Sequence, residues 1–144
     1  MKTWLLIALV ACGGNGGSTP DPDTLPPPPP DGPLPDLPPP RETVTKTYSL
    51  AVGELAEAQM TGGAADRAVL RLSAPVAGID WNIHSHPNGT TINVVVQEGV
   101  MESTYDFVPT EEADWYLLVR NGGPANMDIQ VVADLYGAMT YDDL

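Results

Sequence analysis

Apolar and polar residues alternate with a period of two along most of the chain between residues 42 and 137. The clearest apolar positions are Ile79, Trp81 and Ile83, then Ile92, Val94 and Val96, then Trp115, Leu117 and Val119. Because side chains of a strand point alternately to its two faces, such runs predict strands with one buried side. Turn residues separate the runs, so the pattern predicts an all-β domain over 42–137, an antiparallel, jelly-roll-like β-sandwich of seven or eight strands.

One segment of this domain departs from the strand pattern. Residues Glu54 to Met60 favour a short helix, which Gly62 and Gly63 would end.

A second local signal is the turn dipeptide Asn88-Gly89. It predicts a two-residue hairpin loop that sets Ile83 opposite Val94. The preceding Pro87 also permits a type I turn with a glycine bulge, which would shift the register by one residue. We prefer the two-residue loop because it pairs apolar with apolar side chains.

The segment before the domain is dominated by proline. Residues 20–40 hold twelve of the 16 prolines, together with four aspartates and no basic residue. Proline fixes φ and removes an N–H donor, so this segment predicts an extended polyproline II chain of roughly 65 Å. We interpret residues 12–41 as a tether and 138–144 as an acidic tail. A ligand for a proline-binding domain is the alternative, but the first basic residue is Arg41.

The chain begins with Lys2 and the apolar run of residues 4–10, which predicts a secretory leader. At about 10 Å as a helix, this run is too short to span a bilayer.

The tetrad Leu9-Val10-Ala11-Cys12 then resembles the lipobox of bacterial lipoproteins. The resemblance implies a signal peptide over 1–11 and acylation of Cys12, with palmitate-type chains that anchor the protein in the membrane of the bacterial cell envelope. The outer membrane is favoured, because Gly13 stands where an inner-membrane retention signal carries aspartate. An ordinary leader, with Cys12 a chance residue, is the alternative.

Charge narrows the range of partners. Six basic residues face 19 acidic ones, a net charge of −13, so phosphate backbones are repelled and nucleic acid is not an expected partner. Cys12 is the only cysteine. If it carries lipid, disulfides and cysteine-ligated metals are excluded.

Two histidines are the strongest candidates for chemistry. His84 and His86 lie two residues apart on a predicted strand, so alternation places both on one face with Asp80. Two imidazoles with a carboxylate nearby supply part of the ligand set of a Zn²⁺ or Cu²⁺ site. A solvent-facing polar row is the simpler alternative, and a pH-sensitive or partner-contacting role is the third.

Catalytic signals are missing by contrast. The sequence holds no nucleophile elbow, phosphate loop or His-Glu-x-x-His motif, so we do not expect an enzyme.

A second candidate site is a binding patch of Tyr116, Leu118 and Arg120, which share the face of their strand opposite Trp115. The alternative is that a second sheet covers this face.

Residues 76–136 carry a rhythm of strands that includes Tyr105-Asp106-Phe107-Val108-Pro109 and Trp115-Tyr116-Leu117-Leu118-Val119-Arg120-Asn121. This rhythm resembles the small secreted β-sandwiches of the GOLD and bacterial pre-peptidase C-terminal type. The resemblance implies a non-catalytic binding or accessory module and carries over no functional residue. We therefore expect an envelope lipoprotein that displays a binding module to an envelope protein partner. A metal-binding lipoprotein is the alternative.

Overall fold

The computed structural model describes residues 36–144, and it is all-β in this range apart from one short 3-10 turn. Cys12, the predicted leader and most of the proline-rich segment lie outside the described residues. The elements are β1 (Glu42–Leu50), β2 (Leu55–Gly62), β3 (Arg67–Ser73), β4 (Ile79–Ser85), η1 (Pro87–Gly89), β5 (Ile92–Val100), β6 (Glu102–Phe107), β7 (Ala113–Asn121), β8 (Met127–Tyr136) and β9 (Asp142–Asp143). No helix in this part of the chain has the length and apolar character that a membrane span needs.

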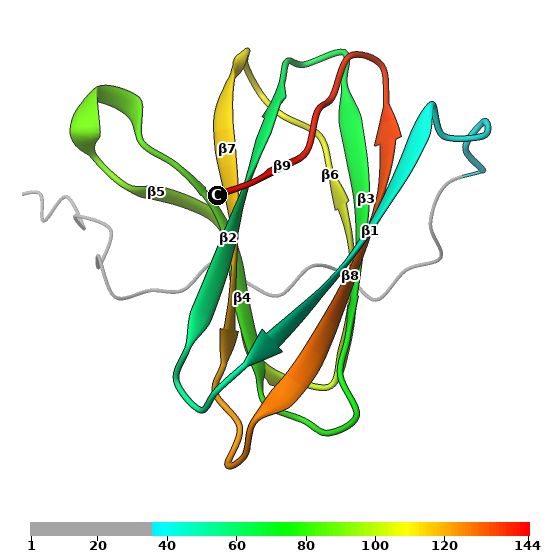
Figure 1. The fold of residues 1–144 in the computed structure, drawn as a ribbon. Coiled ribbons are helices and arrows are strands. Elements are labelled where there is room, and N and C mark those ends of the chain that lie inside the picture. The colour runs from blue at the N-terminus through cyan, green and yellow to red at the C-terminus, as the bar shows by residue number, and fades with distance from the viewer. Residues whose placement is uncertain (1–35) are drawn as a thin grey trace, which may run out of the picture.

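The strands form two antiparallel sheets that pack face to face (Figure 1). One has the order β1-β8-β3-β6 and the other the order β5-β4-β7-β2-β9. Strands β1 and β8, β2 and β7, β3 and β6, and β4 and β5 are thus neighbours, which is the pairing of a double-sheet jelly roll. The predicted sandwich is confirmed, with the two-residue β9 as a ninth strand.

The core lies between the sheets, at the positions that the period-two pattern assigns to it except in β5. There Val95 is buried, whereas Ile92, which the pattern assigns to the apolar face, is 51% exposed. Trp81, Ile83 and Leu117 are fully buried from the five-stranded sheet, and Leu70 and Ile129 meet them from the other. Burying such side chains is worth about 1.5–3 kcal/mol each, and it is the main force that holds the two layers together.

The expected helix at Glu54–Met60 is wrong, because this segment belongs to β2 and pairs with β7 along its length. Ala58 and Met60 are buried in the core, whereas Glu57 and Gln59 lie on the outer face. Alanine, glutamate, glutamine and methionine all favour helices, but local propensity is a weak preference that tertiary context overrides. The alternation of buried and outer residues was the better guide.

The preferred register of the β4–β5 hairpin is correct next to the turn but wrong from Ile83 onward. Ile83 pairs with Val95 rather than Val94, while His84 pairs with Asn93 as expected. The ladder is irregular between these two pairs, so Val94 is an extra residue of β5. The loop is the 3-10 turn η1, whose middle residue has a φ of 54°. The turn thus takes more than two residues, and the extra residue sets Ile83 opposite the buried Val95 in place of Val94.

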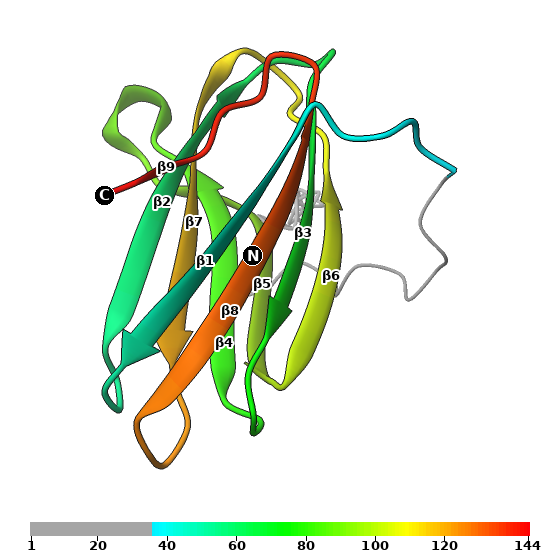
Figure 2. The ribbon, with the colours of Figure 1, turned by 45° about the vertical axis from the view of Figure 1, so that its right-hand side comes forward.

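Residues 138–144, which the sequence presents as an acidic tail, pack against both sheets. Met139 has no exposed surface, and β9 pairs with β2. From β9, Asp143 accepts a hydrogen bond of 2.7 Å from the Tyr48 hydroxyl of β1 and forms an ion pair with Lys46. This segment closes the side of the sandwich where β1 and β2 belong to different sheets (Figure 2).

The sandwich has two unlike ends. The chain enters β1 beside Arg41, whose backbone N–H bonds the carbonyl of Leu135 at the end of β8. The opposite end is built by the loops 51–54, 74–78 and 122–126, which join β1 to β2, β3 to β4 and β7 to β8. We call these three loops the far end; they lie at the bottom of Figures 1 and 2.

Candidate binding face

The two candidate sites from the sequence lie side by side on the outer face of the five-stranded sheet. Strands β4 and β7 are direct neighbours, and their register sets the candidates opposite one another. The cross-strand partners are Asp80 and Arg120, Asn82 and Leu118, and His84 and Tyr116. The structure therefore joins two separate predictions into one face.

The most closely packed part of this face is an imidazole cluster of Glu57, His84, His86 and Tyr116. The His84 ring stacks on Tyr116, with centroids 5.5 Å apart and planes at 25°, and meets His86 edge-on at 4.8 Å. Its Nδ1 lies 2.7 Å from Oδ1 of Asn82, and its Nε2 lies 3.4 Å from Oε1 of Glu57. Only 5% of His84 is exposed, so these neighbours define its chemistry.

The electrostatic balance at His84 favours the neutral ring. Burial lowers the pKa of His84 because the charged form loses its hydration, and the nearby His86 lowers it further. The Glu57 carboxylate acts in the opposite direction and raises this pKa, but the net shift is downward. A neutral imidazole has a single N–H, so His84 cannot donate to both Asn82 and Glu57 until it binds a proton.

Asp80 does not join the two histidines. Its Oδ1 accepts a hydrogen bond of 2.9 Å from the Gly99 N–H, and its Oδ2 lies 3.4 Å from Nε of Arg120. Four residues of strand, about 13 Å, separate it from His84. Across residues 36–144, no three or more histidine, cysteine or acidic side chains converge in a way that could hold a metal ion. The predicted combination of ligands is therefore not assembled.

The predicted patch of Tyr116, Leu118 and Arg120 faces away from the core. Tyr116 and Leu118 are half-buried and Arg120 is exposed, whereas Trp115 and Leu117 are buried against the second sheet. The alternative that a second sheet covers the patch is wrong, because that sheet packs on the opposite face of β7. An aromatic ring, an aliphatic side chain and a guanidinium thus lie in one row.

Glu57 is the member of the cluster that the sequence did not reveal. It belongs to β2, which pairs with β7 on the side away from β4, so His84 reaches it across β7. The alternation of Glu57 and Gln59 with Ala58 and Met60 indicates a strand with Glu57 on its outer face. Because a helix was expected over these residues, Glu57 was not recognised as a neighbour of His84.

Similarity to known proteins adds no function. No model of a known protein family matches the chain, and the search of curated proteins gives no match. The structure establishes a sandwich of two antiparallel sheets, while the resemblance of residues 76–136 to the GOLD and pre-peptidase C-terminal sandwiches stays a prediction.

Proposed function

We propose that this protein is anchored by lipid in the bacterial cell envelope and displays its β-sandwich as a non-catalytic binding module for an envelope protein. The observation that carries the proposal is the tetrad ending at Cys12, which resembles a lipobox and precedes a proline-rich segment. That segment leads into a compact domain at Arg41. Two or more acyl chains on Cys12 would make the anchorage stable.

The proline-rich segment acts in this proposal as a spacer between the membrane and the sandwich. An extended chain with four aspartates resists collapse, so it would hold the domain away from the bilayer. The excess of acidic residues supports the same arrangement, because an anionic membrane surface repels the domain. The outer membrane remains the favoured location, because Gly13 follows Cys12 where an inner-membrane retention signal carries aspartate.

Membrane fractionation of cells that express the full-length chain tests the anchor. The unaltered protein is expected in the membrane pellet and in the detergent phase of a Triton X-114 separation. C12S should leave both fractions, because a serine cannot form the thioether. S18A, just beyond the tetrad, is the matched control and should behave like the unaltered protein. Equal membrane recovery of C12S would overturn the proposal.

Metal binding is the second candidate function, and the separation of 4.8 Å between the His84 and His86 rings favours it. His84 is buried and engaged with Asn82 and Glu57, which leaves His86 as the exposed ligand. A Zn²⁺ titration followed by melting temperature tests it. Metal that binds only the folded state raises stability by about 2.7 kcal/mol at one hundred times Kd. The H86A variant should abolish that rise.

A further inference from the structure

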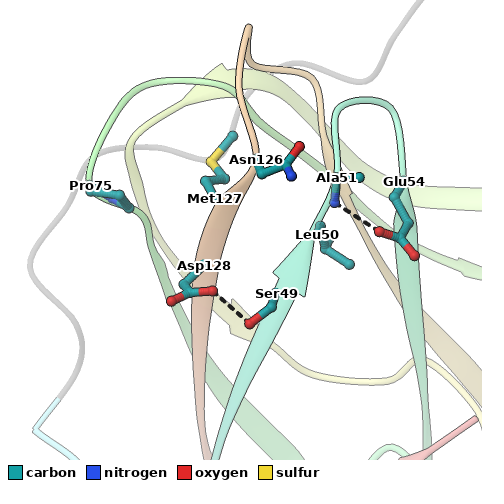
Figure 3. Close-up of a pocket in the computed structure, with 8 residues that line it drawn as sticks. All are labelled: Ser49, Leu50, Ala51, Glu54, Pro75, Asn126, Met127 and Asp128. Carbon is teal, nitrogen blue, oxygen red and sulfur yellow. Dashed lines mark hydrogen bonds between the residues drawn. The ribbon is translucent and has the colours of Figure 1, made fainter.

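The far end of the sandwich contains a cavity that the imidazole cluster does not use. It has a volume of about 520 Å³ and opens between the end of β1, loop 74–78 and the start of β8 (Figure 3). Leu50, Pro75 and Met127 give it apolar walls, and the carboxylates of Glu54 and Asp128 line it as well. The cavity therefore offers both apolar contact and negative charge.

Exposed apolar side chains lie in or beside the connections at this end of the sandwich, although none of them lines the cavity itself. Residues 36–144 hold seven large hydrophobic side chains that are well exposed, and four of them belong to this end. These are Val52 (55% exposed), Leu55 (54%), Val76 (50%) and Met101 (47%). Met101 is tied to loop 74–78 by a hydrogen bond of 2.9 Å from the Ala74 N–H to its carbonyl. Apolar side chains that stay exposed at one end of a domain can contribute contacts to a partner.

The two carboxylates of the cavity keep part of their bonding capacity. Glu54 accepts a hydrogen bond of 2.8 Å from the Ala51 N–H through Oε2, and Asp128 accepts one of 2.6 Å from the Ser49 hydroxyl through Oδ1. Neither carboxylate forms an ion pair within residues 36–144. Each can therefore receive a further donor.

No basic side chain within residues 36–144 pairs with Glu54 or Asp128. All five basic side chains of the domain already lie beside other carboxylates. The pairs are Arg41 with Glu42, Lys46 with Asp143, Arg67 with Asp106, Arg71 with Asp134, and Arg120 with Asp80. Glu54 and Asp128 are therefore open to a cationic side chain of a partner, whereas a second copy of this acidic chain would be repelled.

A buried asparagine holds the far end in one shape. The Asn121 amide donates to the carbonyl oxygens of Leu50 (3.0 Å) and Ala125 (2.8 Å), and its Oδ1 accepts from the Gly123 N–H (2.9 Å). Loop 122–126 is also joined to loop 74–78 by a hydrogen bond of 2.8 Å from the Gly122 N–H to the Gly78 carbonyl. Loops fixed in this way lose little freedom on binding.

We propose that the far end docks a segment of a partner protein in which a lysine or arginine stands among apolar side chains. The cation would lie between Glu54 and Asp128, and the apolar side chains would contact Val52, Val76 and the cavity wall. The inference rests on the proposed function in one respect. If residues 12–41 tether the domain to a membrane, the far end lies opposite the tether and would point away from that membrane. Binding in solution tests the docking site independently of the anchor.

The test uses the full-length chain in detergent and a fluorescein-labelled decapeptide with two lysines and four leucines in a glycine-serine background. Fluorescence anisotropy measures its affinity. The E54Q/D128N variant keeps the local hydrogen-bond acceptors but removes both charges. The E111Q/E112Q variant removes two exposed charges between β6 and β7, at the other end of the sandwich, and is the matched control. V52S/V76S tests the apolar contribution.

The proposal predicts that E54Q/D128N and V52S/V76S each weaken binding about fivefold or more, whereas E111Q/E112Q changes it less than about twofold. A peptide with glutamate in place of lysine should not bind. Equal weakening by the two charge variants would show general electrostatic attraction and overturn the site. Absence of binding at millimolar peptide, or equal binding of the glutamate peptide, would overturn it too. None of these results bears on the anchor, which C12S tests separately.

Discussion

The side-chain amide of Asn121 donates a hydrogen bond of 3.0 Å to the carbonyl oxygen of Leu50, 71 residues earlier in the chain. This contact joins the end of β7, in one sheet, to the end of β1, in the other. Asn121 has no exposed surface, so water cannot replace the bond. The Asn121 side chain therefore fixes loop 122–126 against the end of β1.

Replacing Asn121 by alanine is expected to lower the free energy of unfolding by about 2–4 kcal/mol, because buried groups would lose their partners. Urea denaturation followed by tryptophan fluorescence measures this value. N93A, at an exposed position of β5, is the control and should change stability by less than about 0.5 kcal/mol. Similar stabilities for the two variants would contradict the role of Asn121.

Met139 provides a test of the C-terminal segment as part of the fold. M139A removes a fully buried side chain and should destabilise the domain by about 2–4 kcal/mol. M101A removes the same side chain from a position that is 47% exposed, where we expect a much smaller loss. Thermal unfolding of both variants gives the comparison. A solvated tail would instead make M139A as harmless as M101A.

The burial of His84 predicts a loss of stability in mild acid. Its pKa is lowered in the folded state, so the unfolded chain binds a proton more readily. Stability is therefore unaffected by this group well above its ordinary pKa near 6.5, and it falls as the pH drops from there to the lowered folded pKa. The Glu57 carboxylate opposes this loss and His86 adds to it.

Melting temperatures of the unaltered chain and of H84Q, measured from pH 7.5 to pH 5, check this prediction. H84Q should show a flatter decline in acid than the unaltered chain, because glutamine does not titrate. H86Q, which removes the exposed ring, should retain most of the decline. Identical pH profiles for the unaltered chain and H84Q would rule out His84 as the titrating group.

Gly137 forms the turn before the C-terminal segment. Gly53, which also has a positive φ but lies in loop 51–54, is its matched control. Gly53 and Gly137 have φ values of 80° and 68°, which disfavour any other residue. A Cβ at Gly53 would meet nothing within 4 Å, whereas one at Gly137 would lie 2.2 Å from Oδ1 of Asp66. That carboxylate also accepts the Ala138 N–H at 2.6 Å.

G53A should therefore cost only the backbone strain, about 1–2 kcal/mol, whereas G137A should cost more because Asp66 must move. Urea denaturation of the two variants measures the difference. If G137A unfolds no more easily than G53A, the close approach of Asp66 does not constrain the turn.

The sequence was sufficient for the architecture because alternation alone assigns the faces of strands such as β4, β7 and β8. It failed at residues 54–60, where helix-forming side chains masked a strand whose identity depends on pairing with β7, much later in the chain. It also did not reveal the packing of residues 138–144, since the burial of Met139 depends on neighbours from distant strands.

The candidate site, too, could be predicted from the sequence only in part. Alternation placed His84, His86 and Asp80 on one face and Tyr116, Leu118 and Arg120 on another strand. Only the order of strands in the sheet reveals that β4 and β7 are neighbours, and therefore that His84 stacks on Tyr116. Glu57 could be found only once β2 was known to lie beside β7.

The most direct test of the account is the intact mass of the N-terminal peptide from protein isolated from cell membranes. We predict that this peptide begins at Cys12 and carries the added mass of a diacylglyceryl group and an amide-linked acyl chain. An N-terminus elsewhere, or an unmodified Cys12, would contradict the lipid anchor, and the proline-rich segment would then need another explanation.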